Sequence, residues 1–198
     1  MAIDLPPQLQ ERVVCSIVAA VKYEVPANIV LAVAEKEGGK PGQWSKNSNG
    51  TYDVGAMQLN THYLEDLKKY GITAEDAAQP GCYSYDLAAW RLRGHLQHDK
   101  ADLWTRAANY HSRTPKYNHL YRADLITKAL RWGTWLEARF VTYPVVQPGI
   151  APVRVIRTRT VIKQSYAASI SKKSAPYNQA AAGRLRAYFA QNSMRGFS

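Results

Sequence analysis

The fold follows most directly from one stretch of the chain, Ala27-Asn28-Ile29-Val30-Leu31-Ala32-Val33-Ala34-Glu35-Lys36-Glu37-Gly38-Gly39. Its run of apolar residues predicts a short helix over residues 27–37. Pro26 suits the first turn of that helix, and the Gly38-Gly39 pair is a usual signal for its C-terminal end. The predicted helix therefore has a defined start and end, and its last residue is acidic.

Helix geometry separates the two glutamates of this stretch. Each residue turns an α-helix by roughly 100°, which puts Glu37 near the centre of the apolar arc and Glu35 outside it. A carboxyl on a buried face is desolvated, which raises its pKa and lets it act as a general acid on a glycosidic oxygen. Glu37 is therefore the candidate catalytic acid. The alternative is a frayed last residue that points into water. The residues of the arc are Ile29, Val30, Leu31, Val33 and Ala34.

The chain up to residue 138 is predicted to be mainly helical. Apolar residues at helical spacing predict further helices over residues 8–23, 61–70, 85–98, 101–110 and 117–135. Residues 40–55 are rich in Gly, Asn, Ser and Pro, and Asn49-Gly50 is a favoured hairpin turn, which predicts a loop or short hairpin. The expected apolar face of the first helix consists of Val13, Val14, Ile17, Val18 and Val21.

The positive charge of the chain is concentrated at its C-terminal end. The net charge is +11, yet residues 1–138 hold 16 Lys+Arg against 15 Asp+Glu, whereas residues 139–198 hold 10 Lys+Arg and no acidic residue. We therefore predict a helical domain over residues 1–138 and a basic, partly flexible extension over residues 139–198. Within the extension, residues 153–161 suggest a strand and residues 178–191 a short helix.

The basic extension predicts an anionic partner. Its aromatic residues are interleaved with basic ones, which would suit single-stranded nucleic acid. We favour instead a polycationic segment that keeps the protein near an anionic envelope surface. No stretch is long enough to span a bilayer, and acidic residues precede the apolar run of residues 13–21, unlike a signal peptide. If the protein acts outside the cytoplasm, its export signal was removed before this numbering begins.

The two cysteines and the histidines leave the redox and metal chemistry open. Cys15 and Cys82 lie far apart in the chain, and by number alone they fit one disulfide as well as two buried thiols. His95, His98 and His111 lack zinc spacing with an adjacent glutamate, so we predict neither a metal nor a cofactor.

Three motifs follow one another within residues 10–135. They are Ala34-Glu35-Lys36-Glu37-Gly38-Gly39, Asn49-Gly50-Thr51-Tyr52-Asp53-Val54-Gly55-Ala56-Met57-Gln58-Leu59-Asn60 and Tyr110-His111-Ser112-Arg113-Thr114-Pro115. Together they resemble the lytic transglycosylases, most closely the small members of conjugative plasmids and type IV secretion systems. The resemblance implies a lysozyme-like α-helical fold with a small loop or hairpin region, a periplasmic or envelope location, and a Cys15–Cys82 disulfide.

The resemblance also implies roles for individual residues. Glu37 matches the sole catalytic acid/base of the family, Gln58 a residue of the sugar cleft, and Tyr110 a tyrosine near the catalytic carboxyl. Many members have Ser where this chain has Gly38, so a hydroxyl that orients the carboxyl is missing or supplied elsewhere; many have Asn where this chain has His111. The expected substrate-binding residues are Tyr52, Met57, Gln58, Asn60, Tyr110 and His111.

The expected function is non-hydrolytic cleavage of peptidoglycan strands between N-acetylmuramic acid and N-acetylglucosamine. It would open the wall locally for a conjugation or type IV secretion apparatus, whose components are candidate partners. Asp53 is expected to brace its own loop next to Gly55. If Asp53 instead faced Glu37 across a cleft, a lysozyme-type hydrolase of a phage or secretion system would fit better. The other alternative is a non-catalytic protein that binds wall sugars or nucleic acid.

Overall fold

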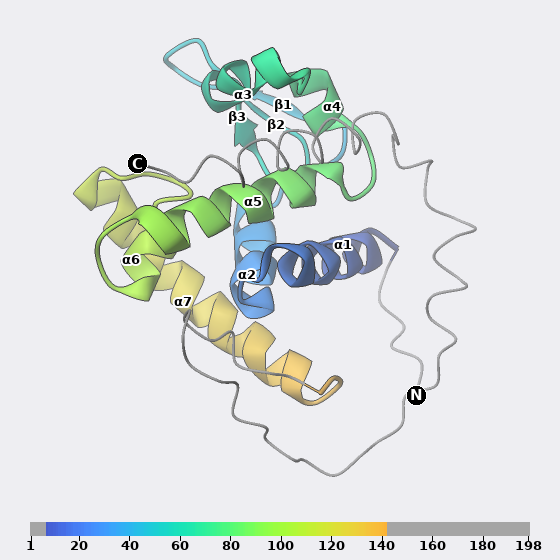
Figure 1. Ribbon diagram of the computed structural model, residues 1–198, viewed down its shortest axis with the longest axis vertical. Helices are drawn as coiled ribbons and strands as arrows, with labels where there is room; N and C mark the ends of the chain where they lie inside the picture. Colours follow the sequence, from blue (N-terminus) through green and yellow to red (C-terminus); the bar gives the residue numbers. More distant parts are fainter. Residues whose placement is uncertain (1–6, 142–198) are drawn as a thin grey trace.

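A computed structural model of the chain describes residues 7–141 and confirms the mainly α-helical fold, which is consistent with a lysozyme-like architecture (Figure 1). The predicted extension over residues 139–198 is described only as far as residue 141, so its expected strand and helix lie outside the described residues. The elements in chain order are α1 (Pro7–Tyr23), α2 (Ala27–Glu37), β1 (Trp44–Lys46), β2 (Tyr52–Val54), β3 (Leu59–Asn60), α3 (Thr61–Leu67), the 3-10 helix η1 (Lys68–Tyr70), α4 (Ala74–Ala78), α5 (Tyr83–His98), α6 (Leu103–Ala108) and α7 (Pro115–Glu137).

Helix α2 has the bounds that its sequence predicts and forms the centre of the core. All six residues from Ile29 to Ala34 are buried, because α1, α5 and α7 contact α2 on different sides. Gly38 ends the helix in the left-handed conformation, with φ 60°, and its N–H donates to the Ala34 carbonyl at 3.2 Å. A helix surrounded in this way holds its last residue, Glu37, in a fixed place.

Helix α5 crosses the middle of the molecule, with the sheet, α3 and α4 on one side and α1, α2 and α7 on the other (Figure 1). The sheet is antiparallel in the order β1-β2-β3, and Asp53 of β2 is paired with Ser45 on one neighbour and Asn60 on the other. The predicted hairpin is confirmed, since Asn49-Gly50 joins β1 to β2 and Gly50 has φ 85°. Among the described residues, no helix is long and apolar enough to cross a membrane.

The predicted apolar face of α1 is wrong in part. Val18 and Val21 are 53% and 74% exposed, whereas the small residues Ala19 and Ala20 are buried. Small side chains let the backbone of α1 approach α2 and α5 closely, so they take the inner face, while the branched valines point outward. Cys15 on the same face forms a disulfide with Cys82, as the resemblance implies.

One helix was not predicted at all. α4 spans only five residues, Ala74–Ala78, which is too short to show apolar spacing. Its sequence signal is a capping box: the Thr73 hydroxyl accepts from the Asp76 N–H, and the Asp76 carboxylate accepts from the Thr73 N–H, each at 3.2 Å. The other helices lie within a few residues of their predicted bounds.

Candidate active site

A polar cleft of about 690 Å³ opens beside the C-terminal end of α2. A smaller hollow adjoins it, and Glu37 and His111 line both, so Glu37 lies where the two meet. The cleft is lined by Glu37, Asn49, Thr51, Asp53, Gln58, Asn60, His62, Tyr63, Arg91, Tyr110 and His111. The smaller hollow adds Lys36, Tyr117, Leu120 and Tyr121.

Glu37 has the environment of a general acid. The pKa of its carboxyl is raised to about 7, because burial and, to a smaller extent, the negative charge of Asp53 outweigh the opposing effects of a Tyr121 hydrogen bond, Arg91 and Lys36. The Tyr121 hydroxyl donates to Glu37 Oε1 at 2.6 Å. The carboxyl is therefore part protonated at neutral pH and held in one orientation. Tyr121 supplies the hydroxyl that Gly38 cannot.

Glu35 has the opposite environment, as its helix phase predicts. Its Oε2 accepts from Trp132 Nε1 at 2.8 Å, and its Oε1 accepts from Arg131 of α7. Burial acts to raise the pKa of this carboxyl, but those hydrogen bonds and the charges of Arg131 and Lys128 outweigh it, so the pKa is lowered. Glu35 is thus an ionised anchor between α2 and α7, outside the cleft.

The loop after β2 packs directly against the end of α2. A Cβ atom on Gly39 would lie 2.2 Å from the Gly55 carbonyl oxygen and 2.8 Å from Gln58 Nε2, so only glycine fits there. Gln58 has φ 45°, and its Nε2 donates to the Gly55 carbonyl at 2.9 Å. This close approach places the Gln58 side chain in the cleft lining together with Glu37.

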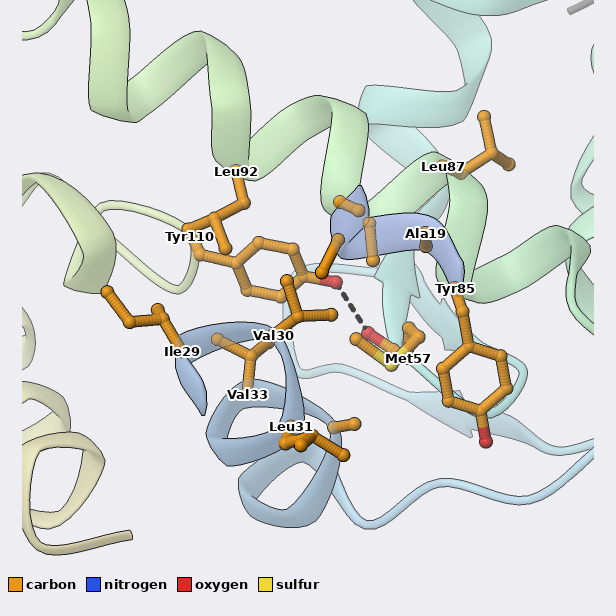
Figure 2. Close-up of a cluster of buried hydrophobic side chains, with 14 of the residues drawn as sticks. Ala19, Ile29, Val30, Leu31, Val33, Met57, Tyr85, Leu87, Leu92 and Tyr110 are labelled. Carbon is orange, nitrogen blue, oxygen red and sulfur yellow. Dashed lines mark hydrogen bonds between the residues drawn. The ribbon is translucent and has the colours of Figure 1, made fainter. Parts of the chain in front are cut away.

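Met57 does not belong to the sugar-binding surface that the sequence suggests. Its side chain is fully buried in the hydrophobic cluster of Figure 2. The hydroxyl of Tyr110 donates to the Met57 carbonyl at 2.9 Å, and Figure 2 shows the Tyr110 ring reaching into this cluster. The hydrogen bond between Tyr110 and Met57 therefore fixes the loop after β2 to the core, and Tyr110 also lines the cleft. The sequence predicts a substrate contact at this apolar residue of a polar motif, but tertiary packing places Met57 in the core.

Two other predicted substrate-binding residues, Asn60 and Tyr52, differ in position: the first lines the cleft and the second does not. Asn60 lines the cleft, caps α3 by accepting from the His62 N–H at 2.9 Å, and donates to Asp53 Oδ1 at 2.8 Å. Tyr52 is not among the cleft-lining residues; its ring packs edge-on against Trp44, 6.0 Å between centroids. Asp53 itself lines the same cleft as Glu37 while it braces the sheet through Asn60.

Arg91 of α5 also lines the cleft, and sequence reasoning missed it. Its guanidinium carbon lies over the Tyr63 ring, 4.5 Å from the centroid, and over the Tyr110 ring, 5.1 Å from the centroid. A basic residue within a helix carries no pattern that distinguishes it from a solvated one, so only the fold brings Arg91 to the site.

The arrangement can be compared with known proteins. The model of the transglycosylase SLT domain family matches residues 14–119, just over half of the chain. The chain belongs to this family. The matched residues of the SLT domain run from α1 to the first turns of α7 and include Glu37, the 55–58 loop and the Tyr110-His111 pair.

Curated relatives of the chain match it over a shorter length than the family model does. Invasion protein IagB of Salmonella typhimurium is 32% identical over 76 residues, which cover 38% of this chain and 48% of that protein. Protein IpgF of Shigella flexneri is 33% identical over 72 residues, which cover 36% of this chain and 47% of that protein. The chain therefore spans about half the length of the curated relatives it matches.

Tyr121 lies just beyond the matched part of the SLT domain. The His111 ring stacks on the Tyr121 ring with 4.8 Å between centroids and 6° between planes, and Lys36 Nζ lies 4.8 Å from the same centroid. Burial, Lys36 and Arg91 lower the pKa of His111, partly opposed by Asp53, so the imidazole is neutral at pH 7. Asn118 fixes the loop that carries His111, because its Nδ2 donates to the Ser112 carbonyl at 3.2 Å. A neutral ring and a cation thus enclose the tyrosine that orients Glu37.

Proposed function

We propose that the protein is a peptidoglycan lytic transglycosylase, which cleaves the β-1,4 bond from N-acetylmuramic acid to N-acetylglucosamine and leaves a 1,6-anhydro end. The observation that carries the proposal is the Glu37 carboxyl, which is desolvated, has a pKa of about 7 and is oriented by Tyr121 at the cleft surface. A group of that pKa can give a proton and then take one back at neutral pH.

In the first step the Glu37 carboxyl protonates the leaving glycosidic oxygen as the bond to the muramyl C1 breaks. Positive charge then develops at C1, and the N-acetyl oxygen of the same sugar stabilises it. Because the substrate supplies this oxygen, the protein needs no second carboxylate as nucleophile, unlike the usual pair in glycoside hydrolysis. The polar side chains of Gln58 and Asn60 provide hydrogen-bonding groups for the sugar in the cleft lining.

In the second step the Glu37 carboxylate removes the proton from the muramyl 6-hydroxyl. The oxygen of that hydroxyl attacks C1, which closes the anhydro ring and displaces the N-acetyl oxygen. Glu37 regains its proton, so the site returns to its starting state without consuming water. The Tyr121 hydrogen bond stabilises the carboxylate between the two steps.

The proposal is tested with purified peptidoglycan sacculi and the Glu37→Gln variant. Wild type should release soluble glycan fragments, whereas the variant should lose activity at least about 100-fold, because Gln cannot transfer a proton. Circular dichroism of both proteins checks that the fold is kept. Equal activity of the two proteins would refute the role of Glu37. Sugar binding without products from wild type would favour a binding protein instead.

A second candidate function, lysozyme-type hydrolysis, is favoured by the position of Asp53. Its carboxylate lines the same cleft as Glu37 and acts on the pKa of Glu37 through its charge. In a hydrolase, Asp53 would be the second carboxylate, and Asp53→Asn would abolish cleavage. In the transglycosylase, Asp53→Asn leaves anhydro products and shifts the alkaline limb of kcat/KM to lower pH, because the charge that raises the Glu37 pKa is gone. Chromatography of the muropeptides separates the two cases.

We further propose that the protein acts in the periplasm or envelope and that its two parts have different roles. The Cys15–Cys82 disulfide suits an oxidising compartment. The domain over residues 1–138 would cut the wall, and the basic residues 139–198 would hold it near an anionic envelope surface or a secretion component. In a conjugation or type IV secretion setting, deletion of the gene should lower transfer, and Glu37→Gln should fail to restore it.

A further inference from the structure

Arg91 is a cation of the cleft that has no ion-pair partner among the described residues. Within residues 7–141 it forms no ion pair with an acidic side chain, although Asp53 and Glu37 line the same cleft. By contrast, Arg93 on the same helix is paired, since its Nη1 lies 3.2 Å from Glu24 Oε2 and donates to the Tyr23 carbonyl at 2.6 Å. The two arginines of α5 thus differ in what they bind.

Two aromatic rings fix the position of the Arg91 guanidinium. It lies over the faces of Tyr63 and Tyr110, at 4.5 Å and 5.1 Å from the ring centroids. Contact with a ring face uses the positive charge and the flat surface of the group but no N–H donor. The Tyr110 hydroxyl is in turn occupied by the Met57 carbonyl, which holds that ring. Within the described part of the chain no hydrogen bond uses the donors of Arg91, so the two rings hold the guanidinium in place with its donors available to a ligand.

A held guanidinium with available donors is suited to a carboxylate, which it can bind through two parallel hydrogen bonds. If the proposed function is correct, the substrate contains such groups. Each muramyl sugar bears a lactyl side chain, which ends in a free carboxylate or continues into a peptide that carries carboxylates, whereas N-acetylglucosamine has none. Arg91 could then distinguish muramyl units from a chitin-like chain of the same backbone.

We propose that Arg91 is a specificity-determining residue that binds a carboxylate of the muramyl unit in the cleft. This inference rests on the proposed function, because it assigns the Arg91 side chain to the same substrate. It predicts that the protein prefers glycan strands with a free carboxylate to the same strands with that group neutralised. Burying a charged hydrogen bond of this kind typically changes affinity by about 10-fold or more.

The test compares two forms of one substrate. Glycan strands stripped of peptide carry the free lactyl carboxylate, and carbodiimide coupling to methylamine turns it into a neutral amide. Wild type should cleave the acid form with about 10-fold higher kcat/KM than the amide form. Arg91→Gln should bring that ratio close to one, and Arg91→Lys should keep part of it, because it preserves the charge but loses the paired donors.

Arg93→Gln is the matched control, since it removes the same charge from the same helix outside the cleft and should leave the ratio at the wild-type value. If Arg91 only supports the two tyrosines or tunes Glu37, Arg91→Gln will lower kcat/KM equally on both forms, which would overturn the proposal. A wild-type ratio of one on both stripped strands and peptide-bearing strands would overturn it as well.

A second arm uses strands that keep their peptides, with their carboxylates either free or amidated. A preference confined to this arm assigns the carboxylate to the peptide, and a preference on stripped strands assigns it to the lactyl group. Calorimetry on the Glu37→Gln background separates this inference from the proposed function. If wild type cleaves nothing, weaker binding of the acid form by Glu37→Gln/Arg91→Gln than by Glu37→Gln still supports the Arg91 site, and equal binding rejects it.

Discussion

Glu35 and Glu37 lie two residues apart on α2 and have pKa values shifted in opposite directions. Glu37 is desolvated at the cleft, so its pKa is raised to about 7, whereas Glu35 binds Trp132 and the cation Arg131, so its pKa is lowered. The difference follows from the turn of the helix, which aims the Glu37 carboxyl into the cleft and the Glu35 carboxyl towards Arg131 and Trp132. One short helix thereby provides both a reactive acid and a structural anion.

These opposite shifts predict opposite effects of pH on stability. The folded state holds the Glu37 proton more tightly than the unfolded chain does, so wild type loses stability as pH rises from about 4.5 to 7. Glu37→Gln lacks this loss and should be more stable than wild type above pH 7, by about 1–3 kcal/mol. Urea unfolding at pH 5 and pH 8 measures it; an equal difference at both pH values would contradict the assigned environment.

Glu35→Gln should behave in the opposite way. A lowered pKa means that the ionised carboxylate stabilises the fold above its unfolded pKa, and that this contribution is lost as pH falls through the folded pKa. The variant should be less stable than wild type at pH 7 by about 1–2 kcal/mol. The two stabilities should converge in acid. The same urea series detects this, and a deficit that persists at the most acidic pH would show that Glu35 acts through packing instead.

Tyr121 should affect both the pH dependence of kcat/KM and the value of kcat. Its hydrogen bond lowers the pKa of Glu37, so Tyr121→Phe should move the alkaline limb of kcat/KM to higher pH. Loss of the orienting bond should also lower kcat by about 10-fold. A rate–pH profile with an unchanged limb would mean that the hydroxyl does not touch the carboxyl during catalysis.

At the residue scale, the sequence locates Glu37 but not its partners. Helix phase needs only neighbouring residues, and it separates Glu37 from Glu35 correctly. Tyr121 of α7 reaches Glu37 from 84 positions further along the chain, and Arg91 of α5 reaches the cleft from 54 positions further. No local pattern in the sequence reports such a contact. The predicted substrate contact at Met57 is wrong for the same reason. The burial of its side chain depends on how the loop after β2 packs against Tyr110, which is distant in the sequence.

At the scale of elements, the site depends on how closely α2 meets the loop after β2. Gly39→Ala would put a methyl group 2.2 Å from the Gly55 carbonyl oxygen, so the loop must move. We expect a loss of about 1–3 kcal/mol in stability and reduced activity, since the same loop carries Gln58. Gly94→Ala is the control: apart from the backbone of its own helix and its chain neighbours, no heavy atom lies within 4 Å of the added methyl. Ala in a helix should add about 0.5–1 kcal/mol of stability. Equal thermal stability of both variants would contradict the close packing.

The elements were predicted well where their signals are local. The bounds of α2 come from Pro26 and Gly38, and the hairpin comes from Asn49-Gly50, all of which act through backbone preferences of a few residues. The inner face of α1 could not be predicted in the same way. Its choice of Ala19 and Ala20 over Val18 and Val21 depends on the space left by neighbouring helices.

At the scale of the whole molecule, the disulfide joins α1 to the residue before α5. Cys15 and Cys82 are 67 positions apart, so the bond closes a long loop that contains α2, the sheet and eight of the eleven cleft-lining residues. A loop of this length is expected to contribute about 4 kcal/mol in the chain-entropy description. The Cys15→Ser/Cys82→Ser variant should therefore unfold at markedly lower urea, as should reduced wild type. Unchanged midpoints would argue that the bond does not restrain the unfolded chain.

The central claim is that Glu37 cleaves the glycan without adding water. Digestion of purified peptidoglycan in water enriched in heavy oxygen tests it most directly, with mass spectrometry of the new muramyl ends. The account predicts anhydro ends that contain no heavy oxygen from wild type, and no new ends from Glu37→Gln. Reducing ends that carry heavy oxygen would contradict it and would assign the cleft to hydrolysis by Glu37 and Asp53.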